Sequence, residues 1–131
     1  MKVYDGNQLI AIVRKYRDWK PGLDFVTSDE TFIQVGTWNY NAGKKLDRHE
    51  HNIVTRQSDI TQECVMVVSG SMNIDFYSSE RNFLQQVCLE QFDYAVIFGG
   101  GHAYEILEDD TKILETKNGP FPGVEIDKTK Y

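Results

Sequence analysis

Hydrophobic and polar residues alternate over short runs along the chain, which is the pattern of half-buried β-strands. Runs rich in β-branched and aromatic residues recur, with turn-forming residues between them. The only segment with helical spacing is a short one near Leu9–Tyr16. The pattern predicts an all-β protein, a sandwich, barrel or jelly roll, because a twisted sheet must cover or close its edges. We expect strands at Phe32–Tyr40, Glu63–Val68, Met72–Tyr77, Gln86–Leu89, Tyr94–Phe98, Ala103–Leu107 and Lys112–Lys117.

The length of the chain suits one domain with a hydrophobic core and is too short for two. Of its 131 residues, 40% are hydrophobic and 26% are charged, which is a globular composition. No repeat, low-complexity tract or linker-like stretch marks a boundary. We expect the barrel core at about residues 30–117 and an extended tail over 118–131. Two prolines and two glycines within 119–123 exclude a central strand in that tail.

Charge and terminal sequence argue against several kinds of partner. The formal net charge is −6 and the longest basic cluster is the pair Lys44–Lys45, so we expect no nucleic-acid face and no membrane binding. The N-terminal segment lacks a signal-peptide pattern, and no stretch approaches membrane-spanning length, so we expect a cytoplasmic protein. Cys64 and Cys88 stand in apolar runs, which favours buried free thiols over a disulfide.

The three histidines and one glutamate are the candidates for a metal site. His49 and His51 are separated by one residue, so on a strand both point to the same face and can reach one ion. Glu63 shares an inward parity with apolar residues, where a carboxylate is costly unless it is paired or bound to a metal. His102 follows three glycines and precedes a strand. We therefore expect His49, His51, Glu63 and His102 to bind a metal; the alternative is a structural or surface role for the histidine pair.

The spacing of these residues resembles a known motif. Gly43, His49, His51, Glu63 and Gly70 follow one another as in the first motif of the cupins, with a longer segment between His51 and Glu63. That segment reads as an insertion of about eight residues in a connecting loop, which should border the site.

A second motif is present in a degenerate form. Gly99 stands three residues before His102, as in the second cupin motif. Ile97 and Ile106 occupy positions where proline and asparagine are common in that family. The segment around His102 and the tail after Leu114 also resemble a group of small bacterial cupins found among surface-polysaccharide and nucleotide-sugar genes.

The cupin resemblance implies a fold, a cofactor and a range of functions. The fold would be a single-domain double-stranded β-helix, a jelly-roll barrel. The cofactor would be one divalent transition metal, Fe(II) before Mn, Ni, Zn or Cu. The function would be that of a metal-dependent enzyme, of oxygenase or isomerase type, acting on a small polar or anionic metabolite, with carbohydrate-related compounds among the candidates. The competing class is a non-catalytic module that binds a metal or a sugar. Metal ligation would leave no histidine free as a base, which counts against a metal-free epimerase.

Five further residues are candidates for substrate binding. Arg56, in the inserted loop, has a planar fork of donors for a carboxylate or phosphate, and its alternative is a solvated loop arginine. Tyr104 shares the inward parity of His102 and is a candidate general acid or substrate clamp, or else a barrel-wall residue. Lys117 either orients substrate or pairs with Glu115 on its own strand. The last two candidates, which either line the cavity or pack in the core, are Trp38 and Tyr40.

We also expect a homodimer. Cys64, Met66 and Val68 share the outward face of one predicted strand, and this apolar face needs a cover, either a second sheet or a partner.

Overall fold

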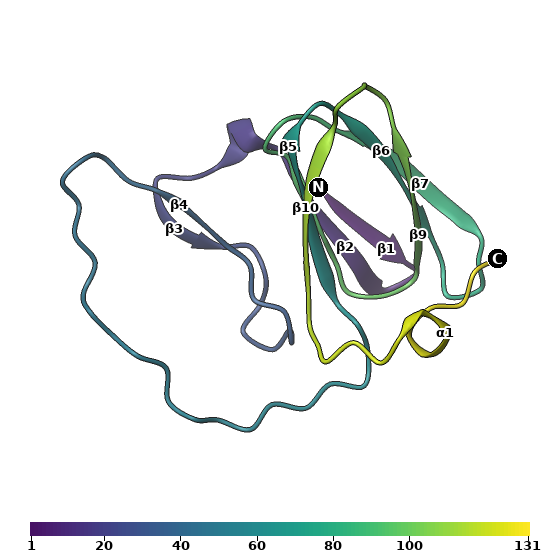
Figure 1. The fold of residues 1–131 in the computed structure, drawn as a ribbon, viewed down its shortest axis with the longest axis horizontal. Helices are drawn as coiled ribbons and strands as arrows, with labels where there is room; N and C mark the ends of the chain where they lie inside the picture. Colours follow the sequence, from purple (N-terminus) through teal and green to yellow (C-terminus); the bar gives the residue numbers. More distant parts are fainter.

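The computed structural model describes residues 1–131 and shows two antiparallel sheets packed face to face (Figure 1). The larger sheet has five strands in the order β1 (Lys2–Asp5), β2 (Gln8–Arg14), β8 (Tyr94–Ile97), β5 (Glu63–Ser69) and β10 (Lys112–Lys117). The smaller sheet has three, in the order β7 (Phe83–Leu89), β6 (Met72–Tyr77) and β9 (Gly101–Ile106). The prediction of an all-β protein is confirmed.

The remaining elements are short. A separate hairpin pairs β3 (Gly22–Phe25) with β4 (Gly36–Asn39). One 3-10 turn spans Tyr16–Asp18, and the helix α1 (Val124–Asp127) lies in the C-terminal tail. No helix combines the length and apolar character needed to span a membrane.

The main core lies between the two sheets. Alternate residues of β6 are buried, and Met72, Ile74 and Phe76 meet inward side chains of the larger sheet such as Val65 and Val67. Fully burying an apolar side chain of this size contributes about 1.5–3 kcal/mol to folding. This packing fixes which side chains of β5 and β9 point inward.

A second apolar cluster covers the outer face of the larger sheet. Tyr94, Val96 and Phe98 form its buried part, and side chains from residues 19–35 pack over it. Cys64 and Met66 contact the same cluster. The cover that we expected from a second sheet or a partner is therefore supplied in part by the N-terminal third of this chain.

The two sheets meet along one side and are open along the other. β1 and β7 contact each other across the sandwich, whereas β9 and β10 are the terminal strands of their sheets. We call the gap between these two free edges the open side. The closed jelly-roll barrel that the sequence resemblance implies is not formed within this chain.

A long excursion of the chain leads from the hairpin back to the sandwich. Residues 40–62, which we call the arm, run from the end of β4 to the start of β5 without regular secondary structure (Figure 1). In Figure 1 the hairpin and the arm project to the left of the sandwich. The arm contains the segment that we interpreted as an inserted loop.

Strand boundaries agree best in the second half of the chain. Met72–Tyr77 and Lys112–Lys117 are strands with the expected bounds, while the strand expected at Phe32–Tyr40 covers only Gly36–Asn39. The helix expected near Leu9–Tyr16 is wrong: this segment is mostly β2, because β1 and β8 hydrogen-bond to it on both sides.

Three other expectations need correction. The core does not begin near residue 30, because Val3 and the buried residues of β2 belong to it. Cys88 is exposed rather than buried, whereas Cys64 is partly buried. The tail over 118–131 is extended for most of its length but includes the short helix α1.

Candidate functional site

Glu63 is a buried carboxylate at the inner face of the larger sheet. It opens β5 and alternates with the buried Val65 and Val67, as its parity predicts. Only 5% of Glu63 is exposed. Because a buried carboxylate is costly without partners, its contacts identify the groups that stabilise its charge.

His102 and Tyr104 reach Glu63 from the opposite sheet. They lie on β9 across from Phe76 and Ile74 of β6, and residues paired in this way share a face, so both side chains point inward. The Tyr104 hydroxyl donates a hydrogen bond of 2.8 Å to Glu63 Oε1. His102 Nε2 lies 2.9 Å from the same oxygen. We call Glu63, His102 and Tyr104 the polar cluster.

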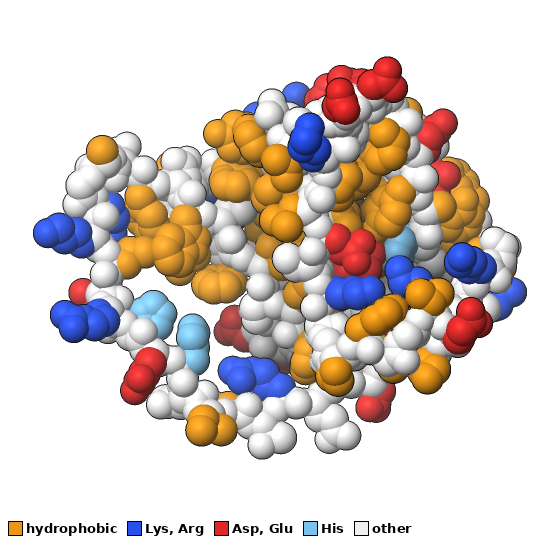
Figure 2. All heavy atoms as spheres, in the orientation of Figure 1, with side chains coloured by type: hydrophobic (Ala, Val, Ile, Leu, Met, Phe, Trp, Pro, Cys, Tyr) orange, Lys and Arg blue, Asp and Glu red, His pale blue; other side chains and the backbone are white.

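Two charged residues of β10 flank the polar cluster. Lys117 pairs with Glu63 in the register of β10 and β5, and Glu115 pairs with Val65, so both share the inner face. Lys117 Nζ lies 3.8 Å from Glu115 Oε1 and 3.8 Å from Asp127 Oδ2 of the tail. Figure 2 shows acidic, basic and histidine side chains together on this face of the sandwich. The open side therefore carries a dense set of ionisable groups.

The environment keeps Glu63 charged. Burial by itself raises the pKa of a carboxyl group, but here the hydrogen bond and charge of His102 and the hydrogen bond of Tyr104 outweigh it. A smaller contribution comes from the positive charge of Lys128. The net effect lowers the pKa of Glu63 below its ordinary value of 4.5, so the carboxylate is ionised at neutral pH.

Tyr104 is held in its neutral form. Burial of its ring, together with the negative charge of Glu63 and the hydrogen bond to it, raises the pKa of Tyr104 well above 10.0. The side chain is nevertheless 39% exposed, so a ligand in the open side can reach it. His102 Nδ1 is a buried nitrogen without a hydrogen-bond partner. The polar cluster thus pairs a charged acceptor with a protonated donor.

The raised pKa values of Tyr94 and Tyr104 predict an incomplete alkaline titration. Burial raises the pKa of Tyr94 to about 12, so we expect two of the seven tyrosines to remain protonated when the folded protein is taken above pH 10. Absorbance at 295 nm measures the phenolate formed. In the unfolded state all seven should ionise near pH 10, so folding stability should fall as the pH rises above that value. Tyr104→Phe should remove one late-titrating phenol; loss of an early one instead would contradict the contact with Glu63.

The histidine pair of the arm does not join the polar cluster in this chain. His49 and His51 are exposed, and their rings contact each other at a centroid distance of 5.4 Å. His49 Nδ1 lies 3.0 Å from the Asp47 carbonyl oxygen, a contact within the arm. The expected ligands therefore divide into two pairs, one on the arm and one in the sandwich. In this structure no three histidine, cysteine, aspartate or glutamate side chains are arranged to hold a metal ion.

Three of the expected substrate-binding residues also lie away from the polar cluster. Arg56 is exposed on the arm, and its side chain donates only to the Val54 carbonyl, at 3.2 Å. Trp38 and Tyr40 are exposed on the hairpin and contact each other edge to face, so the alternative of core packing is wrong for both.

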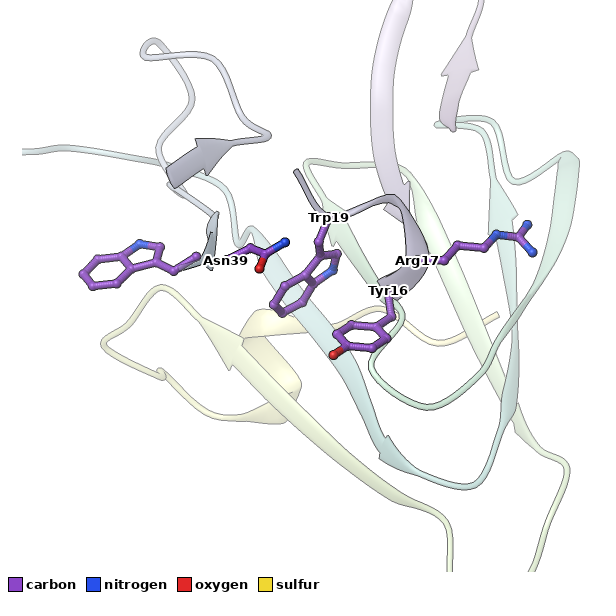
Figure 3. A pocket seen from close by; sticks show the side chains of 5 residues that line it. Tyr16, Arg17, Trp19 and Asn39 are labelled. Carbon is purple, nitrogen blue, oxygen red and sulfur yellow. The ribbon is translucent and has the colours of Figure 1, made fainter. Parts of the chain in front are cut away.

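Trp38 instead borders a pocket between the sandwich and the hairpin. The pocket measures about 310 Å³ and is lined by Tyr16, Arg17, Trp19, Trp38 and Asn39. Figure 3 shows Tyr16 and Trp19 side by side, and their rings contact each other edge to face. None of the polar-cluster residues lines this pocket.

Sequence reasoning missed two features of the site. One is the hydrogen bond from the Tyr104 hydroxyl to Glu63, which depends on how the two sheets are stacked. The other is the inward position of Glu115 and Lys117, which the alternation of β10 leaves ambiguous until its pairing with β5 is known. Glu63 and His102, in contrast, were both named as candidates from the sequence, and the structure brings them into contact.

Comparison of the chain with protein-family models, with curated proteins and with solved structures found no match.

Proposed function

We propose that this chain is an enzyme of the cupin type that transfers protons on a small anionic metabolite at the polar cluster. The observation that carries the proposal is the sharing of Glu63 Oε1 by His102 Nε2, at 2.9 Å, and the Tyr104 hydroxyl, at 2.8 Å. A charged carboxylate beside an imidazole and a neutral phenol provides the proton acceptor and the proton donor that general acid–base catalysis requires. The reaction would be of isomerase or epimerase type.

The two proton-transfer roles follow from the charge states. His102 donates its Nε2–H to Glu63, so the nitrogen that accepts a proton from carbon is Nδ1, which has no hydrogen-bond partner, and the Glu63 carboxylate stabilises the imidazolium that forms. Tyr104 stays protonated and is accessible, so it donates to the oxygen of the neighbouring carbonyl. The objection that no histidine remains as a base does not hold within one chain, where His102 is separate from His49 and His51.

The preference for an anionic substrate rests on two lysines. Lys117 shares the inner face with Glu63, and the charge of Lys128 acts on Glu63 from the tail. The rest of the protein is acidic, with a formal net charge of −6, so these lysines are local attractors for a carboxylate or phosphate. Phosphorylated or nucleotide-linked keto sugars have this charge and the acidic C–H bond that proton transfer needs.

The experiment is a deuterium-exchange assay on such keto sugars. A proton-transfer enzyme in D₂O incorporates deuterium at the carbon beside the carbonyl, which mass spectrometry detects. We expect exchange with the wild type and slower exchange with His102→Gln and with Tyr104→Phe. Tyr4→Phe, an exposed tyrosine on β1, serves as the control and should exchange at the wild-type rate. Equal rates for all three variants would refute the assignment.

The second candidate is a site for a divalent transition metal. It is favoured by one observation: Glu63 and His102, two of the four expected ligands, come from different sheets and are in contact. Carboxylate and imidazole donors suit Fe(II), Mn, Ni, Zn or Cu, which would act as a Lewis acid or an oxygen-binding centre. Elemental analysis of protein purified without added metal tests it. Stoichiometric metal in the wild type and its loss in His102→Ala would support this candidate.

A further inference from the structure

The open side leaves the inner face of the edge strand β9 partly uncovered. Ile106 shares the inward parity of His102 and Tyr104 and lies opposite the fully buried Met72, yet it is 55% exposed. The backbone edges of β9 and β10 beside it carry no neighbouring strand. Free edges of this kind are templates for pairing with another extended segment.

The arm is an extended segment whose contacts with the rest of the chain lie at its C-terminal end, where residues 60–62 hydrogen-bond to the tail and to Ile33. Within residues 41–61 the only backbone hydrogen bond runs from Lys44 N–H to the Asn41 carbonyl, at 3.3 Å. Its large apolar side chains are exposed, and Ile53 is fully so. His49, His51 and Ile53 alternate along the sequence, so as a strand they would share one face. The open side has free strand edges, and the arm is an extended segment that pairs with no strand. Each therefore has the backbone groups and apolar side chains that the other could cover.

The base of the arm lies on the outer face of the larger sheet, away from the polar cluster. Asp24 of the hairpin is paired with Arg14 of β2 at 3.1 Å, and residues 19–35 pack on the outer face of the larger sheet. From this base the arm extends away from the sandwich (Figure 1).

Charge indicates which molecule the arm binds. The arm contains four basic and three acidic side chains, a local charge of +1, whereas the whole chain carries −6, so the remainder carries −7. Acidic side chains border the open side on β10 and in the turn between β9 and β10, and acidic side chains lie at the top of the sandwich in Figure 2. A basic arm on an acidic body is complementary to a second copy of the same chain.

We propose that the arm of one chain closes the open side of a second copy and places His49 and His51 over the Glu63 and His102 of that copy. The interface is reciprocal, as two-fold symmetry requires. It deepens the proposed function and rests on the same polar cluster, because the histidine pair of the other chain then lies beside that cluster and helps to cover it. It also accounts for the division of the four expected ligands between arm and sandwich.

The test is zero-length cross-linking between chains of different isotopic mass. Unlabelled and ¹⁵N-labelled protein are unfolded together, refolded as a mixture and treated with a carbodiimide, which joins lysines to carboxylates in contact. We expect cross-links from Lys44 or Lys45 to Glu108 or Glu115 that join a light chain to a heavy one. Cross-links confined to chains of equal mass, or the absence of these cross-links, would overturn the proposal.

Sedimentation equilibrium provides the second measurement. The wild type should contain two chains per particle, and Ile53→Asp should be a monomer of unchanged circular dichroism. Ile126→Asp, which changes an exposed isoleucine of α1, is the matched control and should remain a dimer. A monomeric wild type, or a dimer that tolerates Ile53→Asp, contradicts the proposal. A cross-linked dimer without deuterium exchange would refute only the proposed reaction.

Discussion

Glu63→Gln is expected to slow deuterium exchange into the substrate by about 100-fold or more, the range in which general acid–base groups contribute. Glutamine keeps the size of the side chain and still accepts the hydrogen bond from Tyr104, so the fold should persist. It removes the negative charge that His102 and Tyr104 now surround. Without that charge the pair cannot take up a proton from carbon, and the rate should fall while substrate affinity changes less.

The matched control for this prediction is Glu105→Gln. Glu105 alternates with the inward-pointing Tyr104 and Ile106 on β9, so it points to the outer face. There its carboxylate accepts a hydrogen bond from the Asn73 side chain at 3.1 Å. The chemical change is identical, but it occurs outside the polar cluster. The exchange rate should remain that of the wild type. A similar loss in both variants would show that overall charge, rather than the position of Glu63, determines the rate.

Phe76→Ala is expected to lower the free energy of unfolding by about 3–5 kcal/mol, because it opens a cavity in a fully packed core. Phe76 is completely buried and lies opposite His102 in the register of β6 and β9. A loss of this size is a large part of the roughly 5–15 kcal/mol that stabilises a typical domain. Chemical denaturation followed by circular dichroism measures it. The variant should also disturb His102 and slow exchange.

Phe83→Ala, on the adjacent strand β7, is the control for packing. Its ring is exposed, so truncation should change the unfolding free energy by less than about 1 kcal/mol. If the two alanine variants were equally stable, the core between the sheets would be wrongly placed.

The sequence predicted those parts of the fold that depend on local alternation. The strand Met72–Tyr77 and the inward parity of Glu63 and of Tyr104 are visible in neighbouring residues, since period-two patterns specify a face. The segment Gln8–Arg14 was misread because its run of apolar residues suits a helix as well as a strand. Only the two neighbouring strands, far away in sequence, decide in favour of a strand.

The candidate site was predictable in part for the same reason. Glu63 and His102 meet because they lie on strands that the pattern places correctly. The position of His49 and His51 depends on the path of the arm, which pairs with no strand, so no alternation pattern in the sequence specifies it. Sequence spacing cannot tell whether such a segment folds over its own sandwich or over that of another chain.

The most direct test of the account is a ¹³C NMR titration of the Glu63 carboxyl group in the folded wild-type protein. Contacts with His102 and Tyr104 should place its pKa below 4.5, so the stability that these contacts supply is present above pH 4.5 and lost as the pH falls through the lower value. His102→Ala should raise that pKa, because burial then acts with less opposition. A wild-type pKa above 4.5, the behaviour of a buried carboxyl without partners, would contradict the polar cluster on which the proposed function depends.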